Sequence, residues 1–186
     1  MKKLIVSALV MFPAAALAHP GRHHVDWLDG FLHPLTGLDH LLALLATGFW
    51  LAQSGTRYKP GFIAGFCAVL AVAVVAGMGF PQFTFEAGII ASLVVLGSLL
   101  AAAVRGPLVL RASVVIATAA VHGFVHGTEL PAGASVIPFV IGLVACSGLV
   151  VIAAMLVGEQ ANKVARGLVA RVAGVALVLT GLAMGF

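Results

Sequence analysis

Six long apolar segments, separated by short polar breaks, constrain the fold of this chain more than any other feature. They cover about Leu32–Gln53, Gly61–Gly79, Glu86–Val104, Leu108–Gly127, Ser135–Val157 and Ala165–Met184. Each is close to the roughly 20 residues that a helix needs to cross a bilayer. Only 9% of the residues are charged, whereas a soluble domain carries about 25%. The sequence therefore predicts an all-α, polytopic membrane bundle of six transmembrane helices, embedded in the lipid bilayer and formed by residues 32–186.

The first 18 residues have the pattern of a secretory signal peptide. Two lysines precede a short apolar stretch, and Ala16-Leu17-Ala18 is a small-x-small cleavage site. The apolar stretch is too short to cross a membrane, and Pro13 interrupts it. We expect cleavage after residue 18, so that the mature chain begins at His19.

The basic residues of the membrane domain predict its orientation. Lys and Arg occur in the breaks near residues 55–60, 105–111 and 163–171, and the breaks at 80–85 and 128–134 contain neither. Because cytoplasmic loops of membrane proteins are enriched in Lys and Arg, the basic breaks should be cytoplasmic and both mature termini outside. A cleaved signal peptide predicts the same side for the N-terminus. The basic residues thus indicate topology, and the net charge of +4 does not suggest nucleic-acid binding.

The first apolar segment contains three ionisable side chains. His33 and His40 are seven residues apart, so on one helix they should point the same way, with His33 about 10 Å nearer the outside. Asp39 would lie about 100° around that helix, at nearly the depth of His40. Ionisable groups are costly in a membrane and usually functional, and imidazole with carboxylate is a ligand set for divalent transition metals. Asp39 could bind the metal, orient His40, or only satisfy a buried histidine.

The fourth apolar segment carries a matching set. His122 and His126 are spaced i, i+4, and Glu129 continues the same stripe. Measured along the two helices from the cytoplasmic side, His40 lies about 21 Å up and His126 about 22 Å up, so the groups should be level. The sequence therefore predicts a metal site formed by Asp39, His40, His122 and His126. Glu129 is either a further ligand or a solvated loop residue.

The segment 19–31 should lie outside the membrane and is rich in metal-binding side chains. An external capture function would use His19, His23, His24, Asp26 and Asp29. Such histidine-rich tracts are a compositional signal, so the alternative is that the cluster has no metal role. Trp27 is placed to anchor the chain at the membrane interface.

Other residues suggest structure rather than chemistry. Cys67 and Cys146 each lie within an apolar segment, and we assign them neither a disulfide nor a metal role. Small residues at helical spacing, such as Gly61 with Gly65, are typical of helix packing in membranes. No Ser–His pair, His-Glu-x-x-His or nucleotide-binding motif is present, so we expect a protein that is not an enzyme.

Two motifs resemble those of a known family. His33-Pro34-x-x-Gly37-x-Asp39-His40 and His122-Gly123-x-x-His126-Gly127-x-Glu129 are similar to the signatures of the HupE/UreJ family. The resemblance covers essentially the whole chain. It implies a permease in the bacterial cytoplasmic membrane that imports nickel, sometimes cobalt, for hydrogenase or urease maturation. By resemblance, the first motif would begin the metal path and the second would complete it, with Ni²⁺ as cargo and no permanent cofactor.

The sequence is also compatible with other functions. A membrane haem protein for electron transfer would use level histidines as axial ligands, but Asp39 beside His40 and the external histidines count against it. The nitrogen and oxygen ligand set argues against a Cu(I) carrier. The sequence does not choose among nickel, cobalt and zinc, and it leaves a homo-oligomer open.

Overall fold

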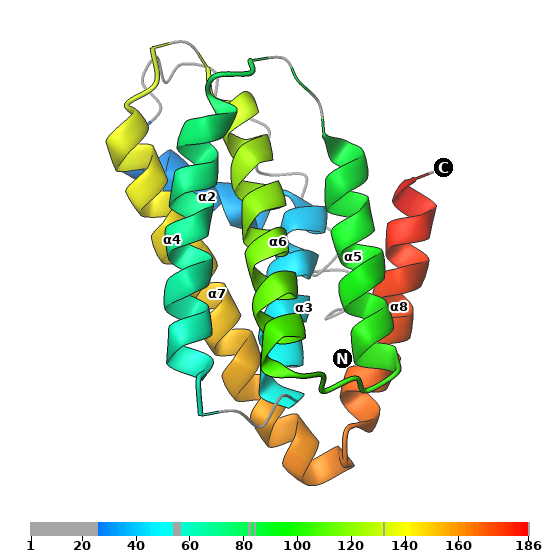
Figure 1. Ribbon diagram of the computed structural model, residues 1–186. Coiled ribbons are helices and arrows are strands. Elements are labelled where there is room, and N and C mark those ends of the chain that lie inside the picture. The colour runs from blue at the N-terminus through cyan, green and yellow to red at the C-terminus, as the bar shows by residue number, and fades with distance from the viewer. Residues whose placement is uncertain (1–25, 54–56, 82, 84, 132, 186) are drawn as a thin grey trace, which may run out of the picture.

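The computed structural model describes residues 26–53, 57–81, 83, 85–131 and 133–185. Within these residues the chain is helical and contains no strand, so the all-α prediction is confirmed. The helices are α2 (Trp27–Thr36), α3 (Leu38–Gln53), α4 (Lys59–Gly77), α5 (Glu86–Ala101), α6 (Leu108–Thr128), α7 (Val136–Ala165) and α8 (Leu168–Met184) (Figure 1). The predicted signal peptide and most of the segment 19–31 lie outside the described residues.

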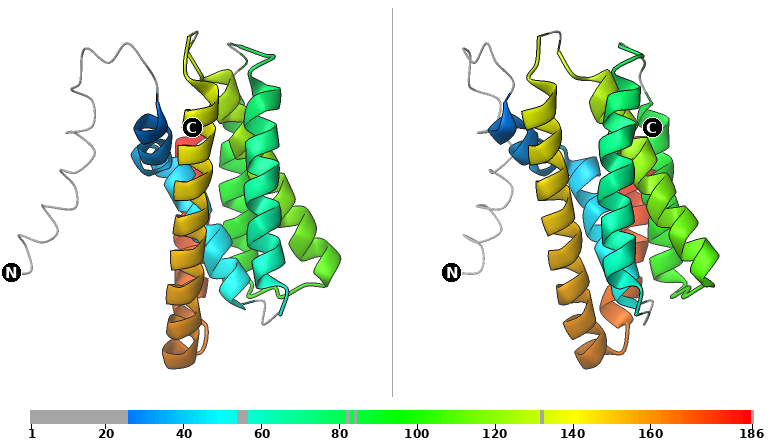
Figure 2. Two further views of the ribbon diagram at one scale, coloured as in Figure 1. Left: turned by 90° about the vertical axis from the view of Figure 1, so that its left-hand side faces the viewer. Right: turned by 60° about the vertical axis from the view of Figure 1, so that its left-hand side comes forward.

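Helix α3 lies at the centre of the bundle. It packs against α7 and α5, while α4 pairs with α6 and α5 pairs with α8. Helix α2 lies against α7 and crosses near one end of the bundle, as the turned views show (Figure 2). The central position of α3 matters because this helix carries Asp39 and His40.

Three helices, α4, α6 and α7, are long and apolar enough to cross a membrane. Helices α2 and α3 meet that criterion only together, and α5 and α8 are shorter apolar helices. Many large side chains on the outer faces are exposed and apolar, with Val72, Val109 and Ile137 each more than 70% exposed. An apolar outer surface of this kind fits a bilayer rather than water. The chain is therefore a helical membrane protein, and six full spans remain a prediction.

The first predicted span is not one continuous helix, so that part of the prediction is wrong. Helix α2 ends at Thr36, α3 begins at Leu38, and the two axes differ by 82°. The Thr36 hydroxyl donates to the His33 carbonyl at 2.8 Å, which occupies an acceptor at the end of α2. The amide of Leu41 donates to the carbonyl of Gly37 and begins the new helix. His33 and His40 therefore lie on two different helices.

The last predicted boundary is also displaced. Helix α7 continues past Val157 to Ala165, where the final span was expected to begin. Arg166 and Gly167 both have positive φ values, 47° and 84°, which is the left-handed conformation that ends helices and that glycine adopts without strain. This turn reverses the chain, and α8 begins at Leu168.

The two ends of the bundle differ in their charged residues. The seven Lys and Arg residues in the described part of the chain lie at or near the α3–α4, α5–α6 and α7–α8 connections, which we call the basic end. Lys59 and Glu159 form an ion pair of 2.6 Å there. The other end, which we call the histidine end, holds α2, the start of α3 and the end of α6 (Figure 1). This separation agrees with the alternation of basic breaks in the sequence.

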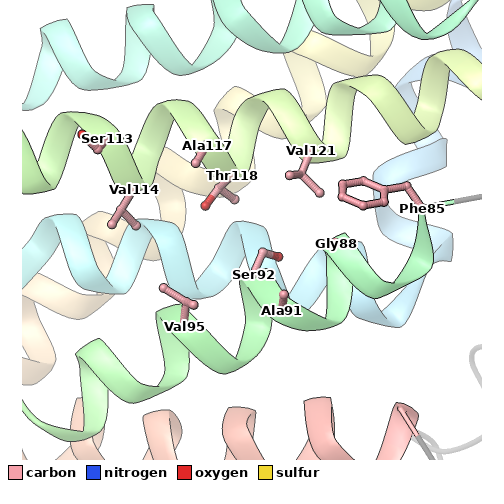
Figure 3. A pocket seen from close by; sticks show the side chains of 10 residues that line it. All are labelled: Phe85, Gly88, Ala91, Ser92, Val95, Ser113, Val114, Ala117, Thr118 and Val121. Atoms are coloured by element: carbon pink, nitrogen blue, oxygen red, sulfur yellow. The ribbon is translucent and has the colours of Figure 1, made fainter.

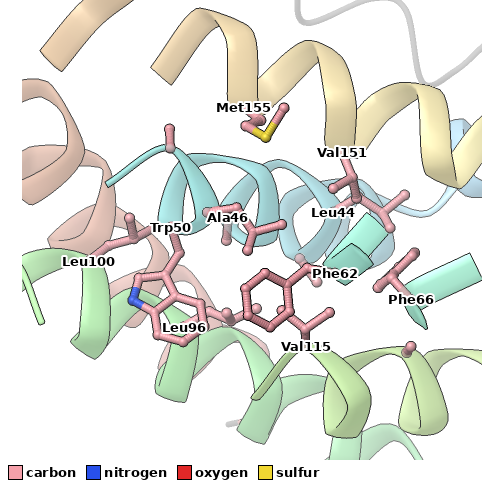
Figure 4. Close-up of a cluster of buried hydrophobic side chains, with 14 of the residues drawn as sticks. Leu44, Ala46, Trp50, Phe62, Phe66, Leu96, Leu100, Val115, Val151 and Met155 are labelled. Carbon is pink, nitrogen blue, oxygen red and sulfur yellow. The ribbon is translucent and has the colours of Figure 1, made fainter. Parts of the chain in front are cut away.

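A buried apolar core fills the bundle between the histidine end and the basic end. Trp50, Phe66, Leu96 and Leu100 are among its fully buried side chains (Figure 4). The indole nitrogen of Trp50 donates to the carbonyl of Val104 at 2.9 Å and ties α3 to the α5–α6 connection.

Gly123 and Gly127 set the distance between α4 and α6, whereas the pair that the sequence suggested, Gly61 and Gly65, does not. A Cβ on Gly123 or Gly127 would collide with backbone carbonyls of α4, so the two helices touch directly behind the site. In contrast, a Cβ on Gly61 or Gly65 would have no neighbour within 4 Å in the described structure. The expected packing function of that pair within the chain is therefore wrong. Cys67 and Cys146 are both free thiols.

Candidate metal site

Four histidine rings meet at the histidine end and form a continuous row. The ring of His33 lies 4.7 Å from that of His126, measured between ring centroids. The ring of His126 lies 4.4 Å from that of His40, and His40 lies 5.1 Å from His122. The four rings, which we call the histidine row, come from three helices, α2, α3 and α6. The sequence predicted that His40 and His126 lie at the same depth in the bundle, and the direct contact of their rings confirms this.

Helix α6 supplies the two most deeply buried rings of the row. His122 and His126 are 2% and 3% exposed, and their i, i+4 spacing places both on the face that meets α3. Gly123 and Gly127 follow them directly and face α4 instead. Because each histidine is followed by a glycine, α6 carries imidazole rings on the face toward α3 and exposes its backbone on the face toward α4.

Asp39 and His40 form a hydrogen-bonded pair in the first turn of α3. The Asp39 Oδ1 atom lies 2.9 Å from His40 Nδ1 and also accepts from the His40 amide at 2.9 Å. A carboxylate near a helix N-terminus is stabilised by the unpaired amides and the helix dipole. Because an ionised carboxylate only accepts, His40 Nδ1 donates, and in the neutral ring Nε2 then carries the lone pair. The geometry supports an orienting interaction between Asp39 and His40, one of the alternatives that the sequence left open.

His33 and Glu129 lie at the exposed end of the row. The His33 Nε2 atom is 3.8 Å from a Glu129 oxygen, and the two side chains are 37% and 51% exposed. Donor atoms of His33, His126 and Glu129 all lie within 4.8 Å of one another, and we call these three residues the outer site. The sequence placed His33 about 10 Å above His40 on one helix; the bend at Gly37 instead puts His33 on α2, with its ring against that of His126.

The inner part of the row contains ring nitrogens that lack protein partners. His40 Nε2, His122 Nδ1 and His126 Nδ1 are buried, and none has a hydrogen-bond partner among the described residues. A buried polar atom without a partner costs about 1–3 kcal/mol, so three in contacting rings call for an explanation. Coordination of a metal ion would be one, although among the described residues only the donor atoms of His33, His126 and Glu129 all lie within 4.8 Å of one another. We call His40, His122 and His126 the inner site, and His126 is common to both sites.

One residue near the site had no signal in the sequence. Ser92 on α5 places its hydroxyl oxygen 3.0 Å from His122 Nε2. Serine is ordinary in a membrane helix, and helical periodicity does not say which helices become neighbours. Only the packing of α5 beside α6 brings this hydroxyl to the row.

The external capture residues are only partly described. His19, His23 and His24 lie outside the described residues. Asp26 caps α2 by accepting from the amides of Leu28 and Asp29, and the Asp29 carboxylate accepts from the Asp26 amide at 3.0 Å. This reciprocal capping box gives both carboxylates a structural function. Metal capture by the segment stays a prediction.

Comparison with known proteins identifies the family. A family model described as "HupE / UreJ protein" matches residues 7–184. Protein HupE of Rhizobium leguminosarum bv. viciae is 35% identical over 178 residues, which cover 95% of this chain and 93% of that protein. No solved structure matches the chain. The two histidine motifs thus predicted the family correctly, and the chain belongs to the HupE/UreJ family.

Proposed function

We propose that this protein is a permease that moves a divalent transition-metal ion into the cytoplasm through the histidine row. Its family is associated with the uptake of nickel or cobalt, and we infer that nickel is the principal cargo. The observation that carries the proposal is the continuity of the row, which leads from exposed His33 and Glu129 to buried, unpartnered nitrogens on His40 and His122.

The two sites differ in a way that suits stepwise transfer. The outer site offers a carboxylate and is partly exposed, so it can capture a hydrated cation. The inner site offers imidazoles, and its nearest negative charge is Asp39, bonded to the far side of His40. Transport requires binding that is favourable enough to admit an ion and weak enough to release it. His126 contacts both His33 and His40, so we infer that it passes the ion from the outer to the inner site.

In the part of the chain that the structure describes, no histidine continues the row toward the basic end. Beyond the row lies the apolar core, and the nearby buried hydroxyl of Thr47 donates to the carbonyl of Ala43 within its own helix. A cation cannot cross a packed apolar layer without a very large desolvation cost. The arrangement therefore favours a carrier that rearranges to release its ion over a permanently open channel.

The direction of transport follows from the charge separation. We infer that the basic end faces the cytoplasm and that the histidine end faces outward. An inside-negative potential would then favour cation entry by about 2.3 kcal/mol per charge per 100 mV. Cysteine labelling in a variant without native cysteines tests this. A cysteine at Ala87 should react from outside and one at Asn162 should not, and the reverse pattern would contradict inward transport.

The ring contacts argue against the haem alternative. Two axial histidines lie on opposite faces of a macrocycle, whereas here the ring of His40 directly contacts the rings of both His122 and His126. A porphyrin would have to separate these rings and the helices that carry them. A metal ion needs no such separation.

Uptake by cells that carry His126→Ala tests the proposed function most simply. The variant removes the ring shared by both sites, so uptake should fall to background while the amount of inserted protein is unchanged. Ser147→Ala is a suitable control, because Ser147 is also a buried polar residue but lies on α7, which contributes no ring to the row. Parental uptake by His126→Ala would rule out the proposed path.

A further inference from the structure

The hydrogen bonds around Ser92 determine which nitrogen of His122 can bind a metal. The Ser92 hydroxyl donates to the carbonyl of Ile89 at 2.7 Å, and its oxygen also lies 3.0 Å from His122 Nε2. A serine hydroxyl has one proton and two lone pairs. The Ile89 carbonyl can only accept, so we assign the proton to it; the Ser92 oxygen then accepts from His122, and the ring is protonated at Nε2. The other nitrogen, Nδ1, then carries the lone pair.

The lone pair on His122 Nδ1 is available to bind a metal ion. His122 Nδ1 is buried and has no hydrogen-bond partner within the described structure, and the ring touches that of His40. We propose that Ser92 is a positioning residue, which holds His122 as its Nε2–H tautomer and so presents Nδ1 to the transported ion. This inference rests on the proposed function for the use of the lone pair, although the tautomer itself does not depend on it.

The arrangement parallels that of His40 with a different partner. Asp39 accepts from His40 Nδ1 and leaves Nε2 free, whereas Ser92 accepts from His122 Nε2 and leaves Nδ1 free. In each case an oxygen holds one nitrogen and the other belongs to the inner site. Partners of this kind orient metal-binding histidines, and their loss typically lowers metal affinity or activity about 10–100-fold. The Ser92 bond adds no negative charge, so its effect on metal affinity comes only from the tautomer and orientation of the His122 ring.

The surroundings of Ser92 make it suitable for substitution. It lines a groove of about 410 Å³ between α5 and α6, together with Ser113, Val114 and Thr118. Figure 3 shows Ser92 reaching from α5 toward α6 along this groove. Removing its hydroxyl therefore opens no cavity in the apolar core. Ser113 lines the same groove and is exposed, so Ser113→Ala is a matched control.

A different explanation is that Ser92 only bonds to its own helix. Serines in membrane helices often donate to a carbonyl one turn earlier without further function. In that case the His122 ring would not depend on Ser92, and truncation would leave both the tautomer and the affinity for metal unchanged.

Nuclear magnetic resonance of metal-free protein with ¹⁵N-labelled histidine distinguishes the two explanations. The His122 signals are identified by their loss in His122→Gln. We expect the parent to show Nε2–H at His122 and Ser92→Ala to show a mixture of tautomers. Titration with Ni²⁺ should give an affinity about 10–100-fold weaker for Ser92→Ala. Ser92→Thr, which keeps the hydroxyl, should restore both properties, and Ser113→Ala should match the parent.

Each outcome bears on the proposal. An Nδ1–H ring in the parent would overturn it, and this measurement needs no variant at the serine. Unchanged tautomer and affinity in Ser92→Ala would also overturn it. If His122→Gln binds Ni²⁺ as the parent does, the inner site of the proposed function fails, whereas the tautomer result stands by itself.

Discussion

Replacing Gly123 with alanine tests the close contact of α4 and α6 that supports the histidine row. An added Cβ would lie 2.5 Å from the carbonyl oxygen of Leu70 and 2.8 Å from the Cβ of Ala73. Ordinary contact begins at 3.4 Å, so α6 must move away from α4 by about 0.9 Å. Overpacking of this kind costs about 1–3 kcal/mol, which exceeds the gain of up to about 1 kcal/mol in helix propensity.

The same displacement should disturb the metal site. Gly123 follows His122 directly, so the ring nitrogens should move by a distance of the same order. In catalytic sites a displacement of about 1 Å can cost about 100-fold in rate, and we expect a loss of metal affinity between about 10-fold and 100-fold. Thermal unfolding of the purified protein measures the first effect, and titration with Ni²⁺ measures the second.

Gly65→Ala provides the matched control for this experiment. Gly65 lies on α4, and a Cβ there would have no neighbour within 4 Å in the described structure. This variant should bind metal normally and be as stable as the parent, or more stable by up to about 1 kcal/mol. If Gly123→Ala unfolds and binds like Gly65→Ala, the close approach of α6 to α4 is not what positions the rings.

Three further substitutions probe the rest of the site. In Gly37→Ala the new Cβ would lie 3.0 Å from His40 Nδ1 and 3.1 Å from Asp39 Oδ1, so we expect weaker Ni²⁺ binding without loss of the fold, and unchanged titration would contradict the tight turn. Asp39→Asn removes the charge behind His40 and should weaken Ni²⁺ binding about 10–100-fold. Asp39→Ala should weaken it further, because it also removes the hydrogen bond to His40 Nδ1; equal effects of the two variants would mean that this hydrogen bond is unimportant. Glu129→Gln should raise the half-saturation concentration for uptake while changing unfolding by less than about 1 kcal/mol, because exposed ion pairs contribute little, and unchanged uptake kinetics would remove Glu129 from the outer site.

The sequence predicted the contents of the site better than its geometry. The stripe of His122 and His126 on α6 and the level of His40 opposite it were predictable, because helical spacing and rise per residue are fixed. The break at Gly37 was not predicted, since hydropathy treats the first apolar segment as continuous. A signal was nevertheless present: Gly37 followed by Asp39 is typical of one helix ending and the next beginning.

Two other features show what sequence patterns omit. Asp26 and Asp29 were interpreted as metal ligands, yet their spacing also resembles a capping box, and that is how the structure uses them. Ser92 gave no signal at all, because its importance depends on which helix packs beside His122. Local patterns predict local structure, whereas neighbours in space are decided by packing of the whole bundle.

X-ray absorption at the nickel edge, recorded on purified protein loaded with one equivalent of Ni²⁺, tests the central claim most directly. We expect at least two imidazole ligands with metal–nitrogen distances near those of zinc sites, about 2.0–2.1 Å. The imidazole signal should fall in His126→Ala and persist in Ser147→Ala. A nickel ion surrounded only by oxygen, with the same spectrum in His126→Ala, would show that the histidine row is not the ion path.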